Sequence, residues 1–172
     1  MADDKSNDTS QYLNFTLGSE IFALDISSVR EVLELTTITK IPRTPSYMCG
    51  VINLRGHAVP VMDMRLKFGM PQTHTTVDTC IIIVEVESGG ESIIMGGKVD
   101  SVREVFDLTE DRIEAAPRMG TSISTDYIKG IGKQDESFVI ILDIAKVFSA
   151  EEMALAKEAL KPDAAADQEK AA

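Results

Sequence analysis

The sequence contains no tryptophan, and aromatic residues make up only 5% of its 172 residues. It also lacks a long hydrophobic run. The longest are Cys80–Val84 and Phe138–Leu142, whereas a membrane-spanning helix needs about 20 apolar residues. The N-terminus is polar and acidic, without the basic-then-apolar pattern of a signal peptide. We therefore expect a cytoplasmic protein with no segment inserted in a membrane.

Cysteine and histidine are scarce, with two of each. Cys49 and Cys80 lie in apolar surroundings, which indicates buried free thiols. His57 and His74 have no companions at the spacing of metal ligands. The sequence therefore predicts neither a metal site nor a cofactor.

Basic residues are outnumbered, because 17 Lys and Arg face 28 Asp and Glu, for a formal net charge of −11. Residues 12–70 carry six basic and five acidic groups, whereas residues 78–148 carry seven and fourteen. A nucleic-acid partner requires a basic face, so this balance disfavours one. Two regions of unlike charge suit a protein that meets its partners through two different surfaces.

Catalytic motifs are missing as well. Gly130–Lys133 lacks the leading glycine and the following Ser or Thr of a phosphate-binding loop. Gly120–Ser124 lacks the closing glycine of a nucleophile elbow. We therefore expect no enzyme activity.

What the sequence does contain is an internal repeat. Val29–Leu35 returns as Val102–Leu108, and Val59–Met64 returns as Val139–Ile144. The offset grows from 73 to 80 residues, as a duplication followed by loop insertions would produce. We expect two copies of one unit, over about residues 12–70 and 78–148, with room for some exchange of strands between them.

Eight short runs rich in β-branched residues, separated by Gly, Pro, Ser and Asp turns, predict strands. They are Tyr12–Leu17, Glu20–Leu24, Met48–Asn53, Ala58–Met62, Thr79–Glu87, Ser92–Met95, Tyr127–Ile131 and Ser137–Leu142. Closing the strands of each copy into a small barrel removes exposed sheet edges. The expected fold is mainly β: two small five-stranded barrels that share one core.

Four short helices are predicted within the copies. Ser28–Leu33 and Ser101–Phe106 combine an N-cap serine, a glutamate three residues later and apolar residues at i, i+3 and i+4. Met64–Phe68 and Ile144–Phe148 each follow an aspartate that can cap a helix.

Outside the copies, residues 1–11 are polar and predicted to be disordered. Glu151–Leu160 is rich in Ala, Glu and Leu and is expected to form a C-terminal helix. The remainder of residues 151–172 is expected to be a disordered acidic tail.

Differences between the copies carry functional information. Asn53-Leu54-Arg55-Gly56 has no counterpart in the second copy. Asn53 and Gly56 suit a turn, but Arg55 has no such explanation. Arginine can pair bidentately with a carboxylate, and both Glu31 and a carboxylate of another protein remain open as its partner. For the repeated valines, Val29, Val32 and their counterparts, we expect a structural role.

Several segments together resemble the CheW family of chemotaxis coupling proteins. They are Tyr12–Gly18, Asp25–Leu33, Ile41–Pro45, Gly50–Gly56, Val59–Arg65, Asp126–Gly132 and Leu142–Ile144. The resemblance spans about residues 12–150 and implies a pair of SH3-like five-stranded β-barrels with short helices. It also implies a monomeric, non-enzymatic adaptor that links the cytoplasmic tips of chemoreceptors to the regulatory domain of the histidine kinase CheA. Such an adaptor is cytoplasmic and reaches membrane receptor arrays through its partners.

The same resemblance implies a set of partner-binding residues, without dividing them between receptor and kinase. They are Val29, Glu31, Val32, Gly50, Asn53, Arg55 and Val105. The chain departs from the family pattern at His57 and at Gly97-Lys98, where a strand usually continues with aliphatic residues. We expect Gly97 and Lys98 to weaken that strand and Lys98 to expose a charge. Two alternatives remain open: a scaffold in another receptor–kinase pathway, and a double barrel that binds a small molecule.

Overall fold

The computed structural model describes residues 9–88, 90–115, 125–134 and 136–148. The C-terminal helix predicted over Glu151–Leu160 and the predicted tail lie outside the described residues. At the other end, the first strand already begins at Thr9, so residues 9–11 are ordered into the sheet where disorder was expected.

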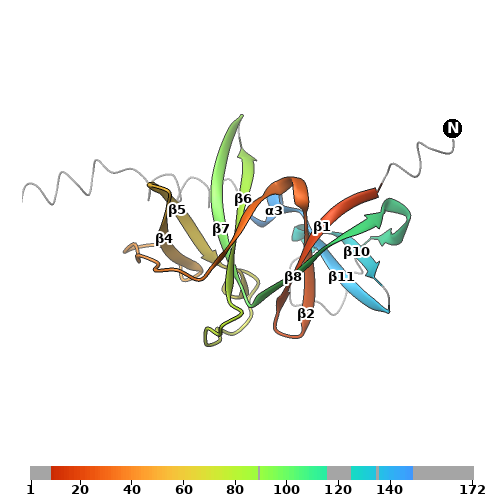
Figure 1. The fold of residues 1–172 in the computed structure, drawn as a ribbon, viewed down its shortest axis with the longest axis horizontal. Helices are drawn as coiled ribbons and strands as arrows, with labels where there is room; N and C mark the ends of the chain where they lie inside the picture. Colours follow the sequence, from red (N-terminus) through yellow and green to blue (C-terminus); the bar gives the residue numbers. More distant parts are fainter. Residues whose placement is uncertain (1–8, 89, 116–124, 135, 149–172) are drawn as a thin grey trace, which may run out of the picture.

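Two curved sheets lie side by side (Figure 1). In spatial order, sheet 1 contains β8 (Ser101–Thr109), β1 (Thr9–Leu17), β2 (Glu20–Asp25), β11 (Ser137–Leu142), β10 (Ile128–Gln134) and β9 (Ile113–Glu114). Sheet 2 contains β3 (Val29–Glu34), β6 (Cys80–Ser88), β7 (Glu91–Val99), β5 (His57–Asp63) and β4 (Met48–Leu54). The expectation of a mainly β fold of two small barrels is confirmed, and each of the eight predicted runs lies on a strand.

The sheets do not coincide with the two copies. The β1–β2 hairpin of the first copy pairs with β8 and β11 of the second, and the β6–β7 hairpin of the second pairs with β3 and β5 of the first. The parallel contacts are equivalent, with Phe22 beside Ile140 in sheet 1 and Val61 beside Gly96 in sheet 2. The copies therefore exchange their hairpins reciprocally, and each sheet needs both.

Two of the four predicted short helices are confirmed. These are α2 (Met64–Lys67) and α3 (Ile144–Val147), and each is capped by the aspartate before it. Asp63 accepts a hydrogen bond from the Leu66 N–H at 3.2 Å, and Asp143 accepts one from the Ala145 N–H at 3.2 Å. Three 3₁₀ turns complete the helical elements: η1 (Ile26–Ser28), η2 (Glu110–Arg112) and η3 (Thr125–Tyr127). None of the helices in the described residues has the length and apolar character needed to span a membrane.

The other two helix predictions are wrong. Ser28–Leu33 lies mainly in β3, and Ser101–Phe106 opens β8. The helix that precedes β3 is η1, and its cap is Asp25, whose side chain accepts from the Ser27 N–H at 2.9 Å. Burial along β3 alternates residue by residue, with Val29, Glu31 and Leu33 on the more covered face and Val32 on the exposed one. The helix-like spacing of Val29, Val32 and Leu33 therefore combines residues from both faces of a strand.

The apolar core has three parts. One cluster fills sheet 1 around Tyr12 and Ile141, and another fills sheet 2 around Ile81 and Ile83. The largest cluster lies between the sheets, where Phe15 stacks on Phe22 with ring centroids 5.7 Å apart. Because this cluster takes residues from both copies, the barrels share a core as expected.

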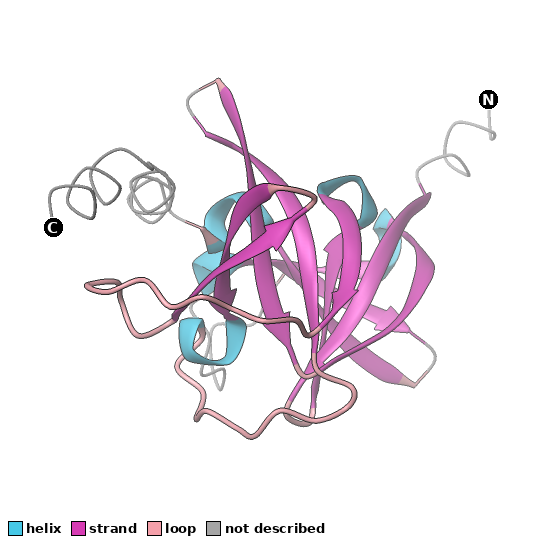
Figure 2. Ribbon diagram, turned by 60° about the vertical axis from the view of Figure 1, so that its left-hand side comes forward, coloured by secondary structure: helices cyan, strands magenta, loops and turns pink. Residues whose placement is uncertain are grey.

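An arginine–aspartate pair supports the junction between the two halves. Asp100, which follows β7, receives two hydrogen bonds from Arg65 at 2.8 and 2.6 Å and a third from the Gly18 N–H at 2.7 Å. Gly18 belongs to the β1–β2 turn, so one carboxylate ties a hairpin of sheet 1 to residues beside α2. Figure 2, with sheet 2 turned forward, shows the long loops that border this side of the molecule.

The prediction that Gly97 and Lys98 weaken a strand is wrong. β7 continues through both residues to Val99 and pairs with β6 on one side and β5 on the other. A Cβ atom on Gly97 would lie 3.1 Å from the Met64 sulfur, and one on Gly96 would lie 2.9 Å from a methyl group of Ile81. The glycines therefore allow close packing. The Lys98 side chain is only 18% exposed, so the expected surface charge is largely buried.

Candidate partner-binding site

The β4–β5 hairpin presents the segment that occurs in only one copy. Leu54 pairs with His57, so Arg55 and Gly56 form a two-residue turn. Both have positive φ, 50° and 86°, as a type I′ turn requires. The Asn53 side-chain oxygen accepts a hydrogen bond from the Gly56 N–H at 2.7 Å. Asn or Gly usually occupies such a position, and arginine is unusual at positive φ. The presence of arginine here therefore points to a role for its side chain.

Arg55 pairs with Glu31 on β3. The guanidinium donates to both carboxylate oxygens of Glu31, each at 2.8 Å. These hydrogen bonds hold the pKa of Glu31 below its ordinary value. The pair connects β3 with the β4–β5 turn, and therefore the two ends of sheet 2. The internal alternative for Arg55 is thus confirmed, while its side chain stays 70% exposed and keeps N–H groups available to another molecule.

In the second copy, an uncharged amide takes the place of the guanidinium. Glu104 lies at the position of Glu31 and accepts a hydrogen bond from the Gln134 amide at 3.0 Å. Its backbone N–H donates to the buried Asn14 side chain at 2.8 Å. Both sheets thus close through a glutamate on an edge strand, but only sheet 2 uses a guanidinium.

Gly50 serves the fold in this structure. Its φ is +141°, and a Cβ atom there would lie 2.0 Å from the Thr39 carbonyl oxygen. The glycine lets the segment after β3 bridge to β4, where Thr39 and Val51 exchange two hydrogen bonds at 2.8 Å. Gly130 does the same beside Ile113 and Glu114.

The repeated valines do not all have the expected structural role. Val29 is half-buried against the core between the sheets. Val32, however, is 40% exposed, and Val105, at the same position of the second copy, is 47% exposed. They lie on β3 and β8, the edge strands of sheets 2 and 1. The structural interpretation is wrong for this pair, because both side chains lie largely outside the core.

The predicted residues therefore form two groups. Glu31, Asn53 and Arg55 are brought together at the β4–β5 turn, and Val29 and Val32 lie on the strand that carries Glu31. Val105 belongs to the other sheet. Gly50 is buried near the start of β4, at the end of the hairpin away from the turn, rather than on the surface.

Two open grooves were not identified from the sequence. One, of about 600 Å³, is bordered by the segment after β3, α2 and the end of β7. The other, of about 550 Å³, lies beside η2, β9, β10 and β11 and includes Phe138, which is 63% exposed. Phe138 was predicted to lie on a strand, but which face of a strand is covered depends on pairing with distant residues.

A metal site or a reactive thiol finds little support in the described part of the chain. It contains no cluster of three or more Cys, His, Asp or Glu side chains that could hold a metal ion. Cys49 and Cys80 are both free thiols. Burial raises the pKa of the Cys49 thiol to about 11, which makes it a poor nucleophile near neutral pH.

Comparisons with known proteins agree with this architecture. The family model for the CheW-like domain matches residues 11–152. The chain is 36% identical over 151 residues to a chemotaxis protein CheW of Klebsiella aerogenes, covering 88% of this chain and 89% of the relative. It is 30% identical over 147 residues to the chemotaxis protein CheW of Treponema pallidum, covering 83% and 84%. The crystal structure of the scaffolding protein TtCheW from Thermoanaerobacter tengcongensis matches with a TM-score of 0.74 and 38% identity, covering 83% of this chain and 94% of that one.

Proposed function

This chain belongs to the CheW family, and we propose that it is a non-enzymatic adaptor that couples chemoreceptors to the histidine kinase CheA. The observation that carries the proposal is the pair of exposed valines, Val32 and Val105, at equivalent positions of two edge strands with different charged neighbours. An adaptor must bind unlike partners, and two diverged copies of one barrel supply unlike surfaces. The adaptor acts in the cytoplasm and reaches receptor arrays through its partners.

The receptor tip is the partner proposed for the valine-bearing edge strands. Val29 and Val32 follow one another along β3, and Val105 occupies the equivalent place on β8. Half-exposed valines offer apolar area that a helical receptor tip can cover. Arg30 and Glu85, paired at 2.8 Å beside Val29 and its β6 neighbour Val84, would form part of the polar border of such a contact.

The kinase regulatory domain is the partner proposed for the two open grooves. The family resemblance implies that this domain has the same fold as this chain, so we propose that it docks through one surface on each barrel. Both grooves are open, and each combines apolar with charged side chains, as transient protein interfaces commonly do. The Glu31–Arg55 pair and Asn53 lie at the β4–β5 turn of the same sheet as the larger groove and are proposed to contribute to binding there.

Co-sedimentation with receptor fragments and CheA tests the proposal. Wild-type protein is expected to join both partners, and the double variant Val32→Ser, Val105→Ser is expected to lose receptor binding while it retains the kinase. Val77→Ser is the matched control, since Val77 is 100% exposed in the segment before β6 and lies outside both edge strands. Failure of the wild type to join either partner would refute the adaptor role.

Arg55→Ala tests the contribution of the turn. If Arg55 serves a partner as well as Glu31, the variant should bind one partner more weakly while its melting temperature stays close to wild type. A lower melting temperature with unchanged binding of both partners would assign Arg55 to the fold alone.

A further inference from the structure

The Lys98 side chain is largely covered, but its ammonium group makes no hydrogen bond within the described residues. It lies on β7, opposite Ile81 and beside Asp63 on the neighbouring strand β5. Its side chain is 18% exposed, and its ammonium nitrogen is 3.9 Å from an Asp63 carboxylate oxygen. The other Asp63 oxygen caps α2. A distance of 3.9 Å allows Coulombic attraction but exceeds that of a hydrogen bond, which is about 2.7–3.2 Å.

No acceptor in the described part of the chain completes the hydrogen bonding of Lys98. Asp63 is its single ion-pair partner among those residues. Asp100 is close enough for Lys98 to lower its pKa, but its carboxylate already receives hydrogen bonds from Arg65 and Gly18. In the described residues no fully buried side-chain nitrogen lacks a hydrogen-bond partner, so the Lys98 ammonium reaches solvent and its three N–H donors are available to an acceptor.

The space around Lys98 determines where an acceptor can approach. On one side is a polar pocket of about 10 Å³ beneath the segment that contains Thr73 and His74, which is barely enough for one water molecule. On the other side is the larger groove, of about 600 Å³. Of these two spaces, only the groove can admit a group the size of a carboxylate.

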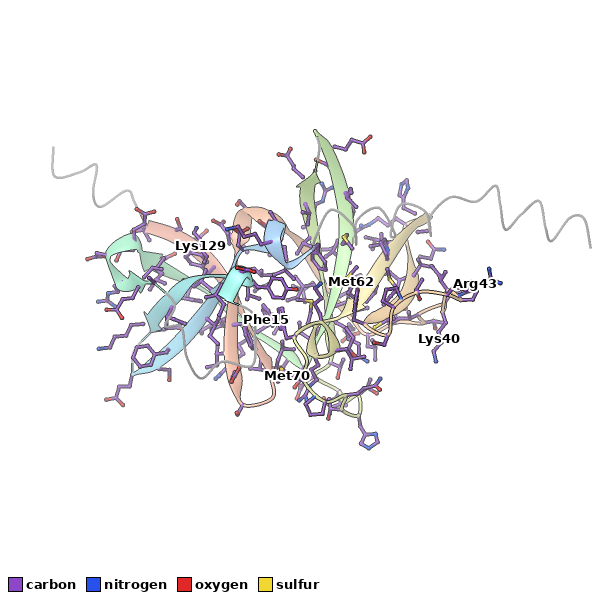
Figure 3. The ribbon with its side chains drawn as sticks, turned by 180° about the vertical axis from the view of Figure 1, so that it is seen from behind. Phe15, Lys40, Arg43, Met62, Met70 and Lys129 are labelled. Carbon is purple, nitrogen blue, oxygen red and sulfur yellow. The ribbon has the colours of Figure 1, made fainter. Side chains whose placement is uncertain are left out.

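The walls of the groove indicate the chemistry of its occupant. Ile38, Ile41, Pro45 and Met48 supply apolar surface, while Lys40 adds a second positive charge. Asp63 is the single acidic residue among the described residues of the lining, and it is 5% exposed. Figure 3 shows Lys40 and Arg43 together at this end of the molecule, far from Lys129 in the other half. A carboxylate flanked by apolar groups complements this arrangement.

We propose that Lys98 is a specificity-determining residue, which binds an Asp or Glu side chain that the kinase regulatory domain inserts into the groove. The inference rests on the proposed function, since it names the chemistry of one of its partners. The positive charges of Lys98 and Lys40 would favour an acidic group at that place and repel a basic one.

The test is the dissociation constant for the isolated regulatory domain, measured with wild type, Lys98→Met and Lys98→Arg at low and high salt. Lys98→Met keeps the length of the side chain and removes its charge. It is expected to weaken binding by about tenfold or more at low salt, as loss of one member of a desolvated charge pair does. Lys98→Arg should recover part of the affinity, and binding of receptor fragments should not change.

Two matched variants separate this role from simpler ones. Asp63→Asn removes the internal partner and leaves the ammonium, so it should bind the domain at least as well as wild type. If Lys98 only stabilised Asp63, both variants would weaken binding together. Lys129→Met removes an equivalent positive charge from an exposed position on β10 and should leave affinity unchanged. Melting temperatures of all variants establish that they are folded.

Each outcome has a distinct meaning. Equal binding by wild type and Lys98→Met overturns the role of Lys98 and leaves the adaptor proposal intact. Failure of wild type to bind the domain refutes the proposed kinase partner and, with it, this inference. If light scattering shows wild type self-associating and Lys98→Met monomeric, the groove holds a second copy of this chain, which also overturns the inference.

Discussion

Gly50→Ala should destabilise the protein strongly, although Gly50 was first assigned to a partner-binding surface. The added Cβ would lie 2.0 Å from the Thr39 carbonyl oxygen and 2.7 Å from its carbon. Ordinary van der Waals contact of a Cβ atom begins at 3.4 Å, so the segment after β3 must move by over about 1 Å. A backbone atom cannot yield by changing rotamer, so the bridge between Thr39 and Val51 must open.

The magnitude follows from three contributions. Opening the bridge breaks two backbone hydrogen bonds, each with a net value of about 1 kcal/mol. Alanine at φ +141° adds backbone strain of about 1–3 kcal/mol. The smaller conformational freedom of the unfolded alanine chain offsets about 0.4–1 kcal/mol. The expected loss is therefore about 2–5 kcal/mol, which lowers the melting temperature of a chain this long by roughly 10 °C.

Thermal unfolding followed by circular dichroism measures this effect, and Gly56→Ala is its control. Gly56 also has positive φ, but a Cβ atom there would meet nothing within 4 Å. It should therefore show strain without a clash, and a decrease of only a few degrees. Equal decreases for the two variants would refute the assignment of Gly50 to the bridge. A stable Gly50→Ala that fails to bind a partner would return Gly50 to the interface.

Three further predictions follow from particular contacts. Lys67→Met should lower the free energy of unfolding by about 1–2 kcal/mol, because the Lys67 ammonium lies 4.9 Å from the Tyr47 ring centroid and 5.3 Å from that of Tyr127. Thermal unfolding measures the loss, with Lys146→Met, in the last turn of α3, as the control. The Arg65 hydrogen bonds lower the pKa of Asp100 in the folded protein below its ordinary value of 3.8. Their contribution to stability is therefore complete above pH 3.8 and is lost as the pH falls through the lowered pKa of the folded state. In denaturant unfolding, Arg65→Met should lose less free energy of unfolding on acidification than wild type does. Cys49 should react with iodoacetamide slowly in a Cys80→Ser background. Its pKa of about 11 leaves about 100-fold less thiolate at pH 8 than a thiol of pKa 9 has, and the rate should fall accordingly. A rate like that of an exposed thiol would contradict the burial of Cys49.

Local signals explain which elements could be predicted from the sequence. Asp63 and Asp143 end a strand and cap the next helix through contacts with residues two or three positions away, so sequence pattern was sufficient. The hairpin at Gly18 and Ser19 is equally local. The sequence pattern did not predict β3 and β8, because the spacing of their apolar residues also fits a helix. The strands that pair with them, β6 and β1, lie in the other copy.

The candidate site was predictable to a similar extent. Arg55 and Glu31 were identified as a candidate pair because the turn gave no reason for an arginine and Glu31 offered a carboxylate. The structure joins them. Lys98 was expected to expose its charge, since the sequence does not reveal that β7 runs between β5 and β6. Exposure of Val32 and Val105 depends likewise on where the sheets end, which no local pattern records.

Reciprocal exchange of hairpins explains how one small chain can hold unlike surfaces in a fixed arrangement. Each sheet depends on a hairpin from the other copy, and the core between them contains Phe15, Met62 and Phe148 from separate parts of the chain. The two barrels therefore cannot drift apart without losing buried apolar area, which is costly. Substitutions on the surface are less constrained, so Gln134 can replace a guanidinium beside Glu104 while Arg55 is kept beside Glu31. The core holds the geometry, and divergence of the two copies is then free to set the chemistry of each face.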